Sequence, residues 1–272
     1  NGANSSFINR LLDPKTDSSW LASGPHDKIK EEKKDIPLPE NIFVNRKNSK
    51  GLDLTQAQEI EKLNAELQAF KDKKIHATSI YTGRDSKNTL SNKILSIADD
   101  SEIGSVDLDN TSEILECLNK NQSKDWSEKN VEERSDILKA IANDIETSPY
   151  ELIYFLMHEA GKTIYNAMDE IREAIDFLRY YSEEIVKIHN RDSILDGPTG
   201  EINTLSYSEK GHFLCISPWN FPVAILIGQI SAALACGNRV TVKPSEHTSI
   251  LGYLVIKKFH KHGVPVSALE LK

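Results

Sequence analysis

The sequence predicts an α/β fold in which helices precede an alternating strand and helix segment. Two observations support this prediction. Between residues 131 and 186, apolar side chains recur every three or four residues, which is the period of a helix. After Gly200 the pattern changes to short runs of apolar and β-branched residues. From residue 211 the order is strand, loop, helix, strand, loop, helix, which is typical of parallel strands joined by right-handed crossovers.

The first third of the chain is less regular. Residues 1–13 carry apolar side chains at near-helical spacing, and residues 14–50 are rich in Lys, Asp, Pro and Ser, as expected of a linker. Residues 54–70 place an apolar stripe after Thr55, so we expect an amphipathic helix with Thr55 as its N-cap. Residues 76–83 and 92–100 suggest short strands. Residues 109–121 suggest a helix that carries Cys117.

The remaining elements are better defined. Helices are expected over residues 130–146, 150–162 and 163–185, with Gly161 ending the second of them. Strands are expected within residues 201–208, 211–217 and 239–243. Helices over 223–236 and 249–262 are expected to end at Gly237 and Gly263.

Composition excludes several classes of protein. The chain has 272 residues, 39% hydrophobic and 27% charged, with a formal net charge of -8 and no sustained basic block, so we expect no nucleic-acid partner. Three cysteines without a CxxC pair predict free thiols, no zinc site and a reducing compartment. The apolar runs are far shorter than the roughly 20 residues that span a bilayer, and no leader opens the chain. A cytoplasmic protein with a small-molecule ligand is expected.

The candidate site consists of the two loops that follow the strands ending near Ile216 and Val242, because ligands of parallel sheets bind beyond the carboxyl ends of the strands. The first loop offers Trp219 and Asn220. The second offers Lys243 and Glu246, a donor and an acceptor that could hold the two hydroxyls of a ribose.

Simpler interpretations remain open from the residues alone. Lys243 and Glu246 could be a surface pair, Asn220 a turn or cap residue, and no GxGxxG fingerprint is present. Packing roles are expected for all three cysteines, including Cys215 within an apolar strand. Solvated or capping roles are expected for the histidines at positions 158, 212, 247, 260 and 262, and surface positions for Glu159, Lys162 and Glu170.

Three linked motifs carry a family resemblance. "SPWNFP", "AALACGNRVTVKPSEHT" and "HGVPVSAL" resemble, in this order, the cofactor-binding half of aldehyde dehydrogenases. The helical region and "GPTGEIN" resemble the branch of the family that oxidises L-glutamate 5-semialdehyde. "NGANSSFINR" and "IPLPENIF…NSKGLDL" resemble the barrel end and the linker of the bifunctional proline utilization A family. The resemblance implies a barrel tail over 1–13, a linker with one helix over 14–74, and a truncated, incomplete Rossmann-type dehydrogenase domain over 75–272.

The resemblance also implies roles for individual residues. Asn220 would stabilise an oxyanion, Lys243 and Glu246 would hold the adenosine ribose of NAD, and Phe221 and Glu170 would approach the substrate. The cofactor would be lined by Ile216, Ser217, Pro218 and Trp219. Glu246 would repel a 2′-phosphate and so favour NAD over NADP.

The same resemblance sets limits on what the chain does. In the family, the cysteine nucleophile and the glutamate base follow the region covered here, so we expect the segment alone to be inactive. FAD would belong to the proline dehydrogenase part and would not be bound by this segment, and the complete protein would be a homo-oligomer. The alternative hypothesis is a non-catalytic nucleotide-binding or interaction module from a decayed gene.

Overall fold

The computed structural model describes residues 12–15, 19, 37–82, 90–109, 112, 124–190 and 194–272. Contacts divide the chain into two units, Asn1–Leu38 and Pro39–Lys272, and all the elements below belong to the second unit. The helix expected over residues 109–121, most of the expected barrel tail and much of the linker lie outside the described residues.

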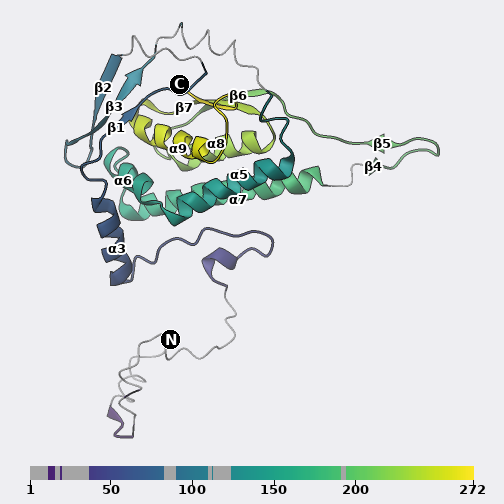
Figure 1. Cartoon of the computed structure of the whole chain (residues 1–272). Helices are drawn as coiled ribbons and strands as arrows, with labels where there is room; N and C mark the ends of the chain where they lie inside the picture. The colour runs from purple at the N-terminus through teal and green to yellow at the C-terminus, as the bar shows by residue number, and fades with distance from the viewer. Residues whose placement is uncertain are drawn as a thin grey trace. The chain divides into compact units, whose positions relative to one another are not determined.

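A parallel sheet confirms the predicted strand and helix order. Strands β6 (His212–Ile216), β7 (Arg239–Lys243) and β8 (Leu269–Leu271) lie in the order β6-β7-β8. Helix α8 (Ala224–Ala235) connects β6 to β7, and α9 (Ser249–Lys261) connects β7 to β8 (Figure 1). The apolar side chains of Cys215, Val242 and Leu271 are paired in register and belong to one buried core. The sequence did not predict β8.

A second sheet lies beside the first. Strands β1 (Ile75–Ala77), β2 (Leu90–Leu95) and β3 (Glu102–Leu108) lie in the order β1-β3-β2, with β1 parallel and β2 antiparallel to β3. A Cβ at Gly104 would lie 2.1 Å from the Ile75 carbonyl oxygen, so only glycine allows β1 and β3 to approach this closely. Ile80 exchanges two backbone hydrogen bonds of 2.9 and 2.8 Å with Leu271, which joins the two sheets.

Helices that precede the parallel sheet in sequence form a layer that packs on α8 and α9. Helix α5 (Val131–Thr147) lies along α7 (Ile164–His189), and α7 also packs on α8 (Figure 1). Helix α6 (Tyr150–His158) contacts α7, α9 and α3 (Ala57–Gln68), so the expected helical region is confirmed. The expected N-cap of α3 is wrong: Gln56 occupies that position, and the Thr55 hydroxyl donates instead to Asp53, at 2.6 Å.

Three short elements complete the second unit. The 3-10 helices η2 (Pro39–Asn41) and η4 (Glu246–Thr248) each form one turn. Strands β4 (Ile194–Leu195) and β5 (Asn203–Thr204) pair as a two-stranded arm (Figure 1), so the strand expected over residues 201–208 is much shorter than predicted.

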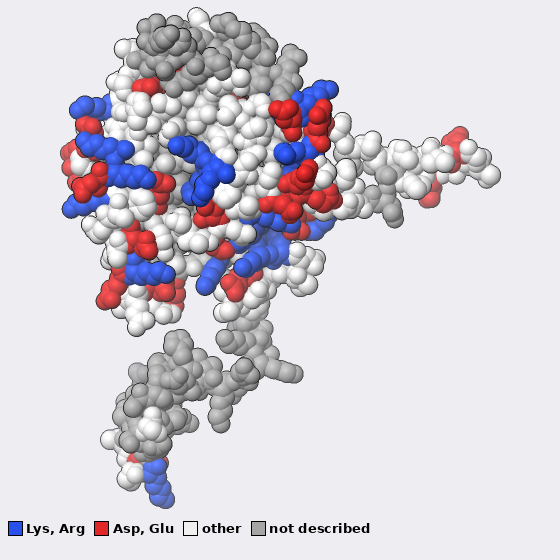
Figure 2. Space-filling view, viewed as in Figure 1, with Lys and Arg blue, Asp and Glu red and all other residues white. Residues whose placement is uncertain are grey.

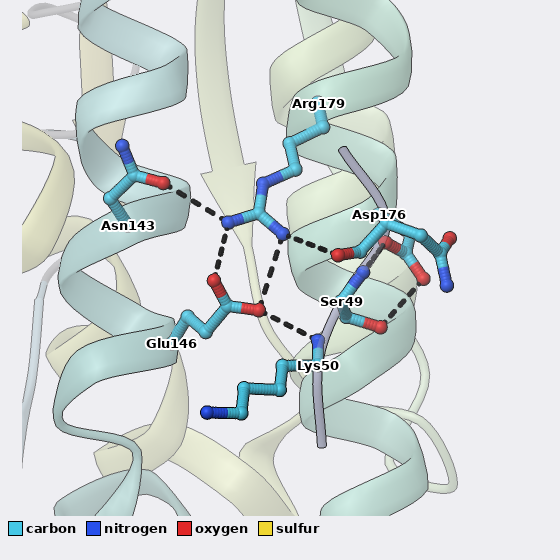
Figure 3. A network of polar contacts seen from close by, with 7 residues as sticks. Ser49, Lys50, Asn143, Glu146, Asp176 and Arg179 are labelled. Atoms are coloured by element: carbon cyan, nitrogen blue, oxygen red, sulfur yellow. Dashed lines mark hydrogen bonds and ion pairs between the residues drawn. The ribbon is translucent and has the colours of Figure 1, made fainter. Parts of the chain in front are cut away.

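A buried arginine joins α5 and α7. The Arg179 guanidinium donates to both carboxylate oxygens of Glu146, at 3.2 and 2.6 Å, and to the side-chain oxygen of Asn143 at 3.0 Å (Figure 3). It also donates to the backbone carbonyl of Asn48 at 3.0 Å. Burial alone would raise the pKa of Glu146, but hydrogen bonds from Arg179 and from a backbone N–H lower it below its ordinary value. The guanidinium therefore links α7, to which it belongs, with α5 and with the backbone at residue 48.

Residues 48–50, which we call the strap, lie against both helices (Figure 3). The N–H and hydroxyl of Ser49 donate to the two carboxylate oxygens of Asp176 on α7, at 2.7 and 2.8 Å. The Lys50 N–H donates to Glu146 on α5, at 2.8 Å. Because the strap has no regular secondary structure, these side chains supply the backbone partners that a strand or helix would otherwise provide.

Loss of the Arg179 guanidinium should destabilise the fold. Arg179→Met leaves the Asn48 carbonyl without this donor and leaves the Glu146 carboxylate with only the Lys50 N–H, so we expect the free energy of unfolding to fall by roughly 2–4 kcal/mol. Urea denaturation followed by circular dichroism measures this change. Lys187→Met on the same helix removes an exposed ion pair with Glu184 and should cost less than about 0.5 kcal/mol. Equal losses in the two variants would contradict this account of the network.

Candidate functional site

Two loops begin side by side at the carboxyl edge of the parallel sheet. The 217–223 loop follows β6 and the 244–248 loop follows β7, and these two strands are neighbours. The Ser217 N–H donates to the Lys243 carbonyl at 3.2 Å, which ties the start of one loop to the start of the other. The structure therefore brings together the two segments that the sequence singled out.

The 217–223 loop presents several of its side chains to solvent. Trp219 is 61% exposed, and Asn220 and Phe221 are also exposed, whereas Ser217 is buried and Pro218 is half-buried. Within the part of the chain that the structure describes, the Asn220 amide makes no hydrogen bond, so its N–H is available to a ligand. Asn220 does not cap the following helix, because the N-cap position of α8 is Val223.

An acidic and a basic side chain lie close together after β7: Glu246 in the 244–248 loop and Lys243 at the end of the strand. The Lys243 ammonium lies 3.9 Å from a carboxylate oxygen of Glu246, and both side chains are more than half exposed. An exposed ion pair at this distance contributes little stability, so both groups can exchange their contact for a ligand at small cost.

A cavity of about 430 Å³ adjoins this pair. It is lined by Lys243, Glu246 and Thr241, and by apolar side chains that include Leu214 of β6 and Val106 of β3. The exposed Ile216 side chain also lies at this edge of the sheet. A largely apolar hollow whose polar lining residues include Lys243 and Glu246 is suited to a flat ring that carries a hydroxylated sugar.

Glu170 does not lie on the surface. Its carboxylate is buried beneath the 217–223 loop, where one oxygen accepts the N–H groups of Val223 and Ala224, at 2.7 and 3.1 Å. The other oxygen lies 2.6 Å from the Lys162 ammonium, which itself sits 4.1 Å from the centre of the Phe221 ring. Both oxygens are engaged inside the protein, so Glu170 supports the loop and does not face a bound substrate.

Glu159 is also buried, and its expected surface position is wrong. Its two carboxyl oxygens accept the N–H groups of Ile250 and Leu251, in the first turn of α9, at 2.8 and 2.9 Å. Burial raises the pKa of Glu159 to about 8, although the two backbone hydrogen bonds oppose this shift. Local sequence did not indicate this role, because α9 has Thr248 at its N-cap position, a residue type that ordinarily caps a helix with its own hydroxyl.

Neither described cysteine is suited to be a nucleophile. Cys215 packs in the core, and burial raises the pKa of its thiol to about 11, which confirms the expected packing role. Cys236, expected to be packed in the same way, is instead exposed at the end of α8, and partial burial raises the pKa of its thiol. Cys117 lies outside the described residues.

The histidines have local partners. His158 stacks on Tyr154 with ring centres 4.2 Å apart, His212 contacts the Thr241 hydroxyl at 2.8 Å, and His260 contacts the Val264 carbonyl at 2.8 Å. His247 and His262 lie within 4.0 and 3.6 Å of acidic side chains. Among the described residues, no three His, Cys, Asp or Glu side chains are grouped so as to hold a metal ion.

Two further features concern the surface charge and the helices of the described residues. On the face drawn in Figure 2, acidic and basic side chains of the described residues are interspersed without a continuous basic stripe. No helix in the described ranges combines the length and the apolar character that a membrane span requires.

Comparisons with known proteins agree with one another. A model of the aldehyde dehydrogenase family matches residues 84–271. Over its whole length the chain is 33% identical to the bifunctional protein PutA of Salmonella typhimurium, of which it spans 20%. Over 53% of its length it is 36% identical to a 1-pyrroline-5-carboxylate dehydrogenase of Anoxybacillus flavithermus, of which it spans 28%.

A solved structure shares the fold. The 1-pyrroline-5-carboxylate dehydrogenase from Thermus, determined with bound NAD, aligns with a TM-score of 0.73 and 23% identity, over 84% of this chain and 45% of that one. The chain thus spans between about a fifth and a half of the proteins that it resembles.

The buried carboxyl group of Glu159 should make stability depend on pH. Because its pKa of about 8 in the folded chain lies above the ordinary 4.5, the folded chain keeps a proton that the unfolded chain has lost between about pH 5 and pH 8. Relative to Glu159→Gln, the wild type should lose stability as pH rises through this interval, by at most about 1.4 kcal/mol per pH unit, and level off above it. Denaturation at several pH values measures the difference, and a constant difference from pH 5 to pH 9 would contradict the assignment.

Proposed function

Because the chain belongs to the aldehyde dehydrogenase family, we propose that it forms the NAD-binding part of an enzyme that oxidises L-glutamate 5-semialdehyde to glutamate. One structural observation supports this most directly: Lys243 at the end of β7, Glu246 in the loop that follows it, and the free amide of Asn220 in the neighbouring loop lie at a single edge of the sheet. The similarity to PutA and to 1-pyrroline-5-carboxylate dehydrogenases supports the choice of substrate.

Each proposed residue has a chemical role that its position permits. Lys243 and Glu246 hold the two hydroxyls of the adenosine ribose, and the adjoining apolar cavity receives the adenine ring. The nicotinamide half of the cofactor lies along the 217–223 loop, against Ile216, Ser217, Pro218 and Trp219. When bound, NAD accepts a hydride from the substrate carbon.

Asn220 acts on the aldehyde oxygen. Attack by a thiolate on the aldehyde carbon places negative charge on that oxygen, and the exposed amide N–H of Asn220 donates a hydrogen bond to it. Neither Cys215 nor Cys236 offers a suitable thiolate, so we assign the nucleophile to a part of the related enzymes that this chain does not span. Phe221, exposed and supported by Lys162, is placed to contact the substrate.

The wider assignment follows from the match to PutA over the whole chain. Residues 1–13 would belong to the end of a proline dehydrogenase barrel, residues 14–74 to a linker that includes the strap and α3, and residues 75–272 to the dehydrogenase domain. In such a protein, FAD-dependent oxidation of proline supplies pyrroline-5-carboxylate, which hydrolyses to the semialdehyde. We assign the complete protein to the cytoplasm, as a homo-oligomer.

The binding role can be tested by calorimetric titration of the chain with NAD and with NADP. We expect NAD to bind more tightly, because the Glu246 carboxylate repels a 2′-phosphate. Lys243→Met should raise the Kd for NAD roughly tenfold through loss of a ribose hydrogen bond. Glu246→Gln should weaken NAD binding and reduce the preference over NADP.

Asn220→Ala is the matched control for this titration. Its amide is assigned to the aldehyde oxygen and not to the ribose, so its removal should leave the Kd for NAD unchanged. Equal binding of NAD and NADP by the wild type, or Kd values unaffected by Lys243→Met and Glu246→Gln, would refute the proposed ribose contacts.

A further inference from the structure

The two helices that follow the candidate loops have no N-terminal cap of their own. The N-cap positions of α8 and α9 are Val223 and Thr248, and neither makes a side-chain capping hydrogen bond. The Thr248 hydroxyl is buried, and it finds no hydrogen-bond partner among the described residues. Without other acceptors, the first N–H groups of both helices would be buried without partners, which is costly.

The helical layer supplies the missing acceptors. Glu159, directly after α6, binds the second and third residues of α9, and Glu170, in the second turn of α7, binds the N-cap and first residues of α8. These contacts join residues that are 53 to 92 positions apart in the chain. Two helix starts are thus fixed by side chains from outside the strand and helix segment.

We propose that Glu159 and Glu170 are positioning residues of the candidate nucleotide site. Glu159 fixes the start of α9 and thereby the 244–248 loop, whereas Glu170 fixes the start of α8 and thereby the 217–223 loop. The assignment of the ligand rests on the proposed function, but the assignment of the loops to these carboxyl groups does not.

Further contacts connect each helix start to the loop before it, so that the position of the helix start determines the position of the loop. A Cβ at Gly252, in the first turns of α9, would lie 2.7 Å from the ring of Pro244, so the 244–248 loop packs directly on the helix that Glu159 holds. On the other side, the Lys162 ammonium lies between the Glu170 carboxylate and the exposed ring of Phe221. A shift of either carboxyl group would therefore move residues at the site.

The same contacts restrict where the cofactor phosphates can bind. In many dinucleotide-binding proteins the pyrophosphate lies on the N–H groups at the start of a crossover helix. Here two N–H groups at each helix start donate to Glu159 or to Glu170, so these four donors are not available to a phosphate. We therefore expect the pyrophosphate to bind elsewhere, in keeping with the lack of a GxGxxG sequence in these loops.

Hydrogen–deuterium exchange of the 272-residue chain, without nucleotide, tests the proposal. In the wild type, the amides of Val223, Ala224, Ile250 and Leu251 should exchange as slowly as amides inside α8 and α9. Glu159→Gln should speed exchange of Ile250 and Leu251 roughly tenfold and leave Val223 and Ala224 unchanged. Glu170→Gln should do the reverse. The alanine variants should show larger effects than the glutamine variants, which keep one acceptor oxygen.

Glu173→Gln is the matched control, because it removes an exposed carboxylate from the same helix as Glu170. It should change neither group of amides. Fast exchange of the four amides in the wild type would overturn the proposal without any variant. It would also be overturned if either glutamine variant sped exchange equally at both loops, since this would indicate a general loss of stability.

A parallel NAD titration separates the positioning role from the ligand assignment. Each glutamine variant should raise the Kd for NAD at least several-fold, whereas Glu173→Gln should not change it. If the wild type bound no NAD, the proposed function would fail while the exchange data still decided the positioning role. If the loops responded as expected but the Kd did not change, the positioning role at the nucleotide site would be refuted.

Discussion

The hydrogen bonds that Glu159 and Glu170 accept from the first turns of α9 and α8 link the helical layer to the edge of the parallel sheet. Both carboxyl groups are buried, and burial of such a group is unfavourable unless its oxygens have partners. Here the helix starts provide the partners, and the helix starts in turn lack caps of their own. The carboxyl groups and the helix starts thus satisfy each other's hydrogen bonds, and these contacts fix where the two candidate loops end.

Helix α7 connects this edge to the strap. Glu170 lies in its second turn, and Asp176 and Arg179 follow further along, where they bind Ser49 and the Asn48 carbonyl. The segment that precedes the dehydrogenase-like elements in sequence is thus attached to the same helix that supports the 217–223 loop. Because protein cores are closely packed and transmit strain, displacement of the strap should shift α7 and, through Glu170, the 217–223 loop.

Much of the fold could be predicted from local sequence patterns, whereas the polar contacts between distant segments could not. The helices over 131–189 and the strands β6 and β7 have clear periods and glycine stops, so the sequence predicted them. β8 is too short to show a pattern, and β3 carries Gly104, Ser105 and Asp107, which conceal its strand character. Thr55 has a residue type that is common at N-caps, which is why the sequence predicts a cap there. In the structure its hydroxyl donates to Asp53 instead.

In the candidate site too, the residues in local motifs could be predicted from sequence, whereas the long-range polar contacts could not. The motif residues could be placed near strand ends from sequence, because Lys243 ends a predicted strand and Asn220 and Glu246 lie in the loops that follow predicted strands. Glu159 and Glu170 could not, since a charged residue near a helix end is usually solvated and their partners are distant in sequence.

A crystal structure of the chain with bound NAD would show whether Glu159 and Glu170 hold the two loops at a nucleotide site. We expect the adenosine ribose between Lys243 and Glu246, with the N–H groups of Ile250 and Leu251 still bound to Glu159 and those of Val223 and Ala224 still bound to Glu170. A phosphate on either pair of N–H groups, or a nucleotide bound away from the 244–248 loop, would contradict it.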